Sequence, residues 1–226
     1  MDRAQDRELR FFGRVAASFT HELKNVLAIV KETAGLMEDL LARTPEGSFP
    51  HQPRFQRGVS TILEQISRGV ELATRMNRFA HSPDHPVAVV DLNEAMEQAC
   101  FLSERLARIK GVALSVSAGD APVTILSCPV RVLLGLFKAY ECCWNHLAPG
   151  GSVRGTVASW GGRARVRFHW SGEAAAGSDF RAALEDSADW RELLDVMGSI
   201  EGGVVWGDGA ELVLELPRES ALDDSK

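Results

Sequence analysis

Residues 12–29 read FGRVAASFTHELKNVLAI, and their pattern indicates a helix that carries a reactive histidine. His21 is followed directly by Glu22, and Asn25 lies one helical turn later on the same face. An unperturbed imidazole is roughly three-quarters neutral at pH 7 and can act as a nucleophile. We expect Glu22 to accept a hydrogen bond from one ring nitrogen, and Asn25 to orient a phosphoryl group or a water. The pattern therefore predicts phosphoryl transfer, with His21, Glu22 and Asn25 as the catalytic residues.

This stretch lies within a longer amphipathic pattern. Apolar residues recur at spacings near three and four from about Gln5 to Arg43, which predicts one long helix. Residues 44–50 contain two prolines and a glycine and interrupt the pattern, and a second helix is predicted from about Arg54 to Ala80. Two helices of this kind bury too little surface alone. The sequence therefore predicts a homodimer, in which two hairpins form a four-helix bundle.

The second half of the chain alternates helix and strand patterns, after a proline-rich linker at 81–86. Asp91 has the pattern of a helix N-cap with Glu94 three residues later, and Gly161-Gly162 predicts a hairpin turn. We expect helices from Asp91 to about Lys110, over 129–147 and over 189–200, and strands over 112–116, 123–126, 152–159, 163–170, 203–206 and 211–216. This order predicts an α/β sandwich with helices on one face of a mostly antiparallel sheet.

The stretch around His21 resembles the H-box helix of two-component sensor histidine kinases. Those related to nitrogen-regulatory kinases often read G-x-x-A-A-x-x-x-H-E-(L/I)-(K/R)-N-P-L-A, and only the proline is replaced here, by Val26. The sequence segments 91–95 and 149–153 resemble segments of the ATP-binding domain that follows this helix in the family. The alternative to this resemblance is an exposed histidine on a coiled-coil face.

The resemblance implies an α+β protein with two domains. Residues 1–82 would form the dimerisation and histidine-phosphotransfer hairpin, and residues 88–217 a GHKL-type ATPase-like sandwich. Residues 218–226 are predicted to be a disordered tail.

The motifs by which this family binds ATP are altered in the second domain. Lys138 stands where the family has an asparagine that ligates Mg²⁺, and a cation cannot be a ligand. Glu141 and Asn145 are the alternative ligands. Trp170 stands where the family has the aspartate that reads the adenine amino group.

The third motif, a glycine pair that opens a helix below the phosphates, corresponds to Ala188–Arg191, which contains no glycine. Asp189 in this stretch would repel phosphate from a helix N-terminus. The segment 174–187 is also short and acidic for an ATP lid. We therefore expect that this chain binds neither ATP nor another cofactor.

Together, these expectations predict a phosphorelay protein that resembles dimeric histidine phosphotransferases. His21 would accept a phosphoryl group from a response-regulator receiver aspartate and donate it to another, and the receiver would supply Mg²⁺. Phe19 and Lys24 are expected to dock the receiver. The alternatives are an active histidine kinase without an attached sensor, a response-regulator phosphatase that uses Glu22 and Asn25, and a non-enzymatic pseudokinase scaffold.

Composition argues against several other classes. The chain has 226 residues and a formal net charge of -6, which disfavours a nucleic-acid partner. No run of about 18 apolar residues occurs, so no membrane span is expected. Residues 1–8 are charged and unlike a signal peptide, and a cytoplasmic location is expected.

The cysteines and the linker histidines lack the spacing of a metal site. His81 and His85 have helical spacing, but the prolines at 83 and 86 predict a loop there. Buried, unreactive thiols in a reduced compartment are expected at Cys100, Cys128, Cys142 and Cys143.

Overall fold

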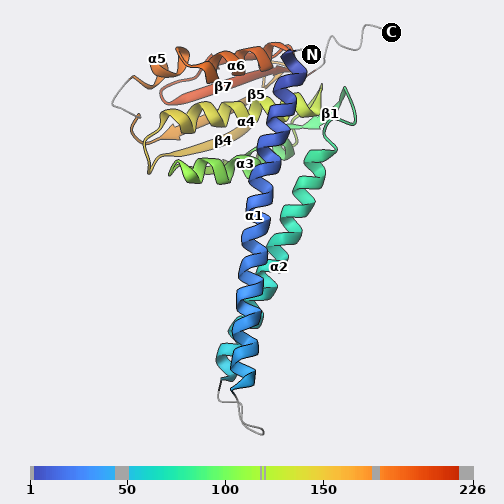
Figure 1. Ribbon diagram of the computed structural model, residues 1–226. Helices are drawn as coiled ribbons and strands as arrows, with labels where there is room; N and C mark the ends of the chain where they lie inside the picture. Colours follow the sequence, from blue (N-terminus) through green and yellow to red (C-terminus); the bar gives the residue numbers. More distant parts are fainter. Residues whose placement is uncertain (1–2, 44–50, 118, 120, 175–178, 219–226) are drawn as a thin grey trace. The chain divides into compact units, whose positions relative to one another are not determined.

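The computed structural model describes residues 3–43, 51–117, 119, 121–174 and 179–218 of the chain (Figure 1). The chain divides into two compact units. The helical unit is Arg14–Ala80, and the sandwich unit joins Met1–Gly13 to His81–Lys226. The domain boundaries expected from the sequence, 1–82 and 88–217, stay predictions, and the predicted tail from 219 onward lies outside the described residues.

The helical unit contains most of α1 (Arg3–Ala42) and all of α2 (Gln52–Ala80), within a few residues of the predicted helices. Val15, Ser18, Glu22 and Val26 form a buried stripe on α1, because their spacings of three and four place them on one face. On α2, Gly69 permits close approach, since an added Cβ would lie 3.3 Å from a Val26 methyl carbon.

The sandwich unit is built on a five-stranded sheet in the order β2-β4-β5-β7-β6. β2 and β4 pair in parallel, and the other neighbours are antiparallel, so the predicted mostly antiparallel sheet is confirmed. The strands are β2 (Ala113–Ser117), β4 (Ser152–Trp160), β5 (Arg163–Ser171), β6 (Gly203–Trp206) and β7 (Glu211–Pro217).

Three helices, α3 (Leu92–Ile109), α4 (Pro129–His146) and α6 (Ala188–Gly198), form a layer on one face of this sheet (Figure 1). Tyr140 of α4 packs edge-on against Phe168 of β5, with ring centroids 4.9 Å apart. Gly155 of β4 leaves space for the Met96 methyl group of α3, which an added Cβ would meet at 1.8 Å. The predicted α+β fold with a helical hairpin and a sandwich is confirmed.

A hairpin turn and a helix cap show how the local sequence determines the structure of this unit. Gly161 and Gly162 join β4 to β5 with φ angles of 52° and 81°, a conformation that glycine adopts without strain. Asp91 caps α3 as predicted, because its carboxylate accepts a hydrogen bond from the Asn93 amide at 2.8 Å.

The sequence patterns do not predict two short elements. β1 (Ala88–Asp91) pairs antiparallel with β3 (Thr124–Ser127) in a separate two-stranded sheet, and α5 (Phe180–Glu185) precedes α6. Each is too short for a periodic pattern to stand out.

The first turns of α1 pack against α4 and belong to the sandwich unit. Arg131 Nε donates a hydrogen bond to Glu8 Oε1 at 2.9 Å. Phe11 contacts Phe137, with ring centroids 5.0 Å apart. A continuous helix therefore begins within one unit and continues into the other.

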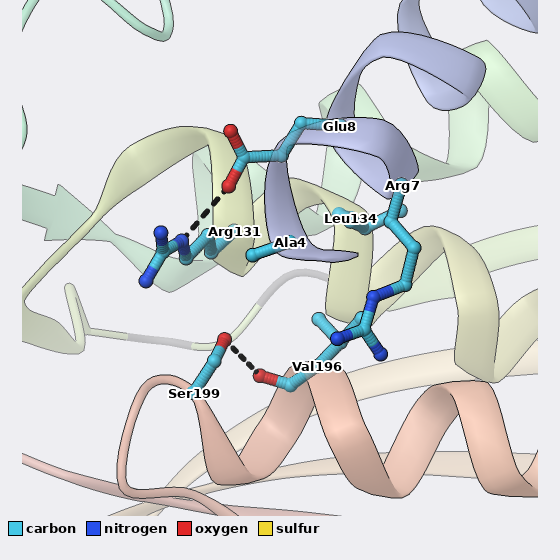
Figure 2. A pocket seen from close by; sticks show the side chains of 7 residues that line it. All are labelled: Ala4, Arg7, Glu8, Arg131, Leu134, Val196 and Ser199. Atoms are coloured by element: carbon cyan, nitrogen blue, oxygen red, sulfur yellow. Dashed lines mark hydrogen bonds and ion pairs between the residues drawn. The ribbon is translucent and has the colours of Figure 1, made fainter. Parts of the chain in front are cut away.

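Figure 2 shows the small pocket that these turns form with α4 and α6. Val196 of α6, Ser199 at the C-terminal end of α6 and Arg7 of α1 line the pocket. Arg7 Nη1 also donates to Asp195 Oδ2 at 2.9 Å. The cavity volume of about 10 Å³ is room for one water, so this pocket is a packing feature and not a ligand site.

Candidate functional site

His21 lies near the middle of α1, outside the buried stripe, and its side chain is exposed. Asn25 Nδ2 lies 3.3 Å from His21 Nδ1, as the spacing of one helical turn predicts. An amide nitrogen can only donate, so Nδ1 accepts in this geometry and a neutral ring carries its proton on Nε2. Among the described residues no other side chain hydrogen-bonds to the ring, which leaves Nε2 open to an approaching group.

Glu22 lies in the buried stripe and is only 8% exposed. Arg68 Nη2 of α2 donates a hydrogen bond to Glu22 Oε2 at 2.7 Å, and the Arg68 side chain is 48% exposed. In the described part of the chain the imidazole is therefore bonded to Asn25 and not to Glu22. The predicted role of Glu22 as the acceptor for a ring N–H stays a prediction, and it requires the carboxylate to leave Arg68.

The two predicted docking residues lie within one turn of His21. Phe19 is half-buried and Lys24 is exposed, as is Asn25. The structure thus brings His21 and Asn25 into contact and leaves Lys24 accessible beside them. The docking roles of Phe19 and Lys24 stay predictions.

In the sandwich unit, Lys138 of α4 is held by two carboxylates. Its Nζ lies 2.8 Å from Glu141 Oε2 and also pairs with Glu192 of α6. Burial lowers the pKa of the Lys138 ammonium, but the two glutamates outweigh burial and raise the pKa above its usual value. Glu141, one alternative metal ligand, therefore bonds a cation of the protein itself.

Asn145, the other alternative ligand, donates a hydrogen bond to Asp189 Oδ2 at 2.9 Å. Asp189 lies in the first turn of α6, and the N-cap Ser187 accepts a hydrogen bond from the Trp190 amide at 3.0 Å. A helix N-terminus attracts phosphate through free amide groups and its positive dipole end. One amide is capped here and a carboxylate stands beside it, so this terminus is poorly suited to phosphate.

Trp170, near the end of β5, belongs to an aromatic cluster with Phe180, Trp190 and Trp206. Trp170 and Phe180 stack with ring centroids 4.2 Å apart, and Trp190 and Trp206 stack at 5.3 Å. Trp170 also meets Trp206 edge-on at 6.1 Å. Side chains of the protein therefore fill the space beside residue 170.

Polar contacts hold α5 on this aromatic cluster. Trp206 Nε1 donates to Glu185 Oε1 at 2.7 Å, and Arg181 Nε donates to the same oxygen at 3.0 Å. The hydrogen bonds from Arg181 and Trp206 lower the pKa of the Glu185 carboxyl. The Arg181 guanidinium also lies 5.0 Å from the centre of the Trp206 ring.

The thiols divide into two pairs. Cys142 and Cys143 are buried, and burial raises the pKa of both thiols, so both are poor nucleophiles as predicted. Cys100 and Cys128 are partly exposed, so the prediction that all four are buried is wrong for these two. Cys128 is the N-cap of α4, whereas Cys100 lies in the middle of α3.

The described residues contain no group of three His, Cys, Asp or Glu side chains placed to hold a metal ion. His81 instead pairs with Asp84, with 2.7 Å between Nδ1 and Oδ2. Nor does any helix in this part of the chain have the length and apolar character needed to cross a membrane.

Sequence reasoning does not identify Arg68 or Phe180. A signal for Arg68 exists, because Glu22 falls on an otherwise apolar or small-residue stripe and a buried carboxylate needs a cationic partner. Which arginine of α2 would meet Glu22 depends on the register of the two helices, which the sequence leaves open.

Comparison with known proteins gives one informative sequence match. The sensor histidine kinase ZraS of Klebsiella oxytoca is 26% identical over 180 residues, which cover 79% of this chain. The chain is a relative of two-component histidine kinases. It spans 37% of the length of ZraS. No family model matches the chain.

Solved histidine kinase structures are also similar to the chain. Histidine kinase AdeS of Acinetobacter baumannii matches 88% of this chain and 98% of its own, with 11% identity and a TM-score of 0.46. The catalytic domain of histidine kinase ThkA matches 60% of this chain and 97% of its own, with 15% identity and a TM-score of 0.46.

Proposed function

We propose that the chain is a histidine phosphotransferase of a two-component phosphorelay that works without ATP. His21 takes a phosphoryl group from the phospho-aspartate of a response-regulator receiver domain and donates it to a receiver aspartate. The observation that carries the proposal is the exposed His21 ring within an H-box sequence. The Asn25 amide contacts Nδ1 of this ring, and Nε2 is accessible to a partner.

The transfer is a single displacement at phosphorus. In the tautomer that carries the ring proton on Nδ1, the His21 Nε2 lone pair attacks, the P–O bond to the aspartyl carboxylate breaks, and its electron pair leaves with the carboxylate. Such chemistry depends mainly on positioning and on stabilising charge on the phosphoryl oxygens. The receiver supplies Mg²⁺ and the acceptor aspartate, and this chain supplies the imidazole, with Phe19 and Lys24 beside it as docking residues.

Three contacts support the absence of ATP from this scheme. Lys138 is paired with glutamates where the related kinases have a metal ligand. Asp189 stands at the N-terminus of α6 where phosphate would need open amides. Phe180 stacks on Trp170 where adenine would need a carboxylate. ATP binding would need all three to rearrange.

Homodimerisation is part of the proposal because apolar side chains of the hairpin are exposed. Leu36 and Leu63 are each 59% exposed, which is costly for a helix pair in water. Leu27, Ile29, Leu41, Val59, Ile66 and Val70 are also exposed. A second copy would cover these side chains in a four-helix bundle, with an obligate interface of about 2,000 Å² or more.

A response-regulator phosphatase is the second candidate, because the Asn25 amide beside His21 can also direct a water to a receiver phospho-aspartate. The two functions differ in product. A phosphotransferase retains label on the chain, whereas a phosphatase releases free phosphate and leaves the chain unlabelled.

The test is incubation of the full chain with phosphorylated receivers from the same genome, followed by detection of acid-labile label. We expect label on the unmodified chain and none on His21→Gln, whose circular dichroism should be unchanged because residue 21 is exposed. Acid-labile label that persists on His21→Gln contradicts the proposal.

A further inference from the structure

Glu22 combines two features that rarely occur together. It is a carboxylate in the packed stripe of the hairpin, 8% exposed, and it is the immediate neighbour of the nucleophile. Its partner Arg68 comes from the other helix of the hairpin, with 2.7 Å between Nη2 and Oε2. The acid best placed along the sequence to act on His21 is therefore bound to a different residue.

This arrangement determines which nitrogen of the neutral His21 ring carries the proton. Asn25 donates to Nδ1, so the proton of the neutral ring sits on Nε2, the atom open to a phosphoryl donor. A protonated ring nitrogen has no lone pair for attack on phosphorus. Productive transfer needs the other tautomer, in which Nδ1 carries the proton and gives it to a hydrogen-bond acceptor.

Glu22 can become that acceptor. Consecutive side chains on a helix diverge by about 100°, so the Glu22 side chain must swing from the hairpin face to the surface to reach Nδ1. Leaving the buried stripe restores water to the carboxylate, and Arg68 is already 48% exposed and stays hydrated when released. Since a buried ion pair often gains little over its desolvation cost, the two positions of Glu22 can be close in free energy.

We propose that Arg68 is a positioning residue that holds Glu22 away from His21 and so keeps the imidazole in its unreactive Nε2–H tautomer. When Arg68 releases Glu22, the carboxylate accepts Nδ1–H and displaces the Asn25 amide, and Nε2 gains its lone pair. The ring proton stays on Nδ1 while the N–P bond forms and the receiver's P–O bond breaks. This inference rests on the proposed function of His21 and adds a control of that same site.

The tautomer can be measured without any partner. ¹⁵N NMR of the histidine-labelled full chain at pH 8, with His21 assigned by His21→Gln, should give Nε2–H for the unmodified protein. Arg68→Gln should shift His21 toward Nδ1–H, and Arg68→Lys, which keeps a cation beside Glu22, should not. The shift should vanish in Arg68→Gln combined with Glu22→Gln. An unchanged tautomer in Arg68→Gln, or a shift that survives in the double variant, overturns the inference.

Glu22→Gln alone provides a second comparison that does not depend on the folding of an Arg68 variant. If Arg68 holds Glu22 away from the ring, Glu22→Gln leaves the tautomer of His21 unchanged. A change of tautomer in Glu22→Gln means that Glu22 already bonds the ring, and it overturns the inference.

Transfer from a phosphorylated receiver is the functional readout. We expect Arg68→Gln to take up label about tenfold faster than the unmodified chain, since a positioned acid or base contributes at least this much. The gain should be absent in the double variant. If neither the unmodified chain nor any variant takes up label, the proposed function fails, and the tautomer comparison still decides the role of Arg68.

Discussion

Trp170 and Phe180 stack on one another, with ring centroids 4.2 Å apart and planes inclined by 21°. The sequence resemblance places Trp170 at the position of the aspartate that reads adenine in histidine kinases, and it places Phe180 of α5 within the segment expected to be the ATP lid. If this correspondence holds, the Phe180 ring occupies the place where a nucleotide base would bind. The stack shows that side chains of the protein pack around Trp170.

The first prediction follows from the proposal that the chain works without ATP. A ligand at a hundredfold excess over its dissociation constant stabilises the native state by about 2.7 kcal/mol, which gives a clear thermal shift. We expect no shift of the melting temperature with millimolar Mg-ATP. A reproducible Mg²⁺-dependent shift with ATP, absent with GTP, contradicts the account and favours the kinase alternative.

The aromatic stack should also contribute to stability. Trp170 is 8% exposed, so Trp170→Ala should lower the free energy of unfolding by about 3 to 5 kcal/mol. Trp160 is 57% exposed and contacts Arg165, and Trp160→Ala is the matched control, with an expected change of about 1 kcal/mol or less. Urea denaturation measures both. Equal effects of the two substitutions would show that the stack is not part of the core.

The raised pKa of Lys138 predicts that the free energy of unfolding falls at alkaline pH. Its pKa is raised above the ordinary 10.5, so its contribution is fully present below that value and is lost as pH rises through the raised pKa. Lys138→Met should cost about 3 kcal/mol near pH 8, because it removes the ammonium group that pairs with the nearly buried Glu141.

The loss caused by Lys138→Met should shrink as pH rises from 10.5 through the raised pKa, where the folded unmodified chain also loses its cation. Denaturant unfolding at stepped pH measures the difference, with the exposed Lys31→Met as control. A difference that stays constant from pH 8 to beyond the raised pKa argues against the pairing.

The oligomeric state tests the role of the exposed apolar side chains. Leu36→Glu should give monomeric or unfolded material, because it places a charge among side chains that a second copy would cover. Lys31→Glu, an exposed change on the same helix, should leave the dimer intact. Light scattering distinguishes these states, and a monodisperse monomer for the unmodified chain refutes the dimer.

Much of this architecture could be predicted from the sequence because its signals are local. The apolar period along α1 and α2 gives both helices to within a few residues, and Gly161-Gly162 gives the hairpin turn. His21 and Asn25 are adjacent because one helical turn separates them, so their contact is also local.

The features that could not be predicted depend on contacts distant in sequence. The Glu22–Arg68 pair is set by the register between two helices, 46 residues apart. The strand β1 forms because β3 offers it a partner, and its four residues carry no periodic pattern of their own. α5 is likewise short, and Phe180 packs against Trp170 from a segment that reads as an acidic lid.

The most direct test of ATP-independent transfer to His21 compares two phosphoryl donors in parallel. The full chain is incubated with Mg²⁺ and γ-labelled ATP, or with a labelled phospho-receiver, and acid-labile label is counted on the unmodified chain and on His21→Gln. We predict label from the receiver alone, and only on the chain that retains His21. Label on His21 from ATP alone contradicts the account and makes the protein an autophosphorylating kinase.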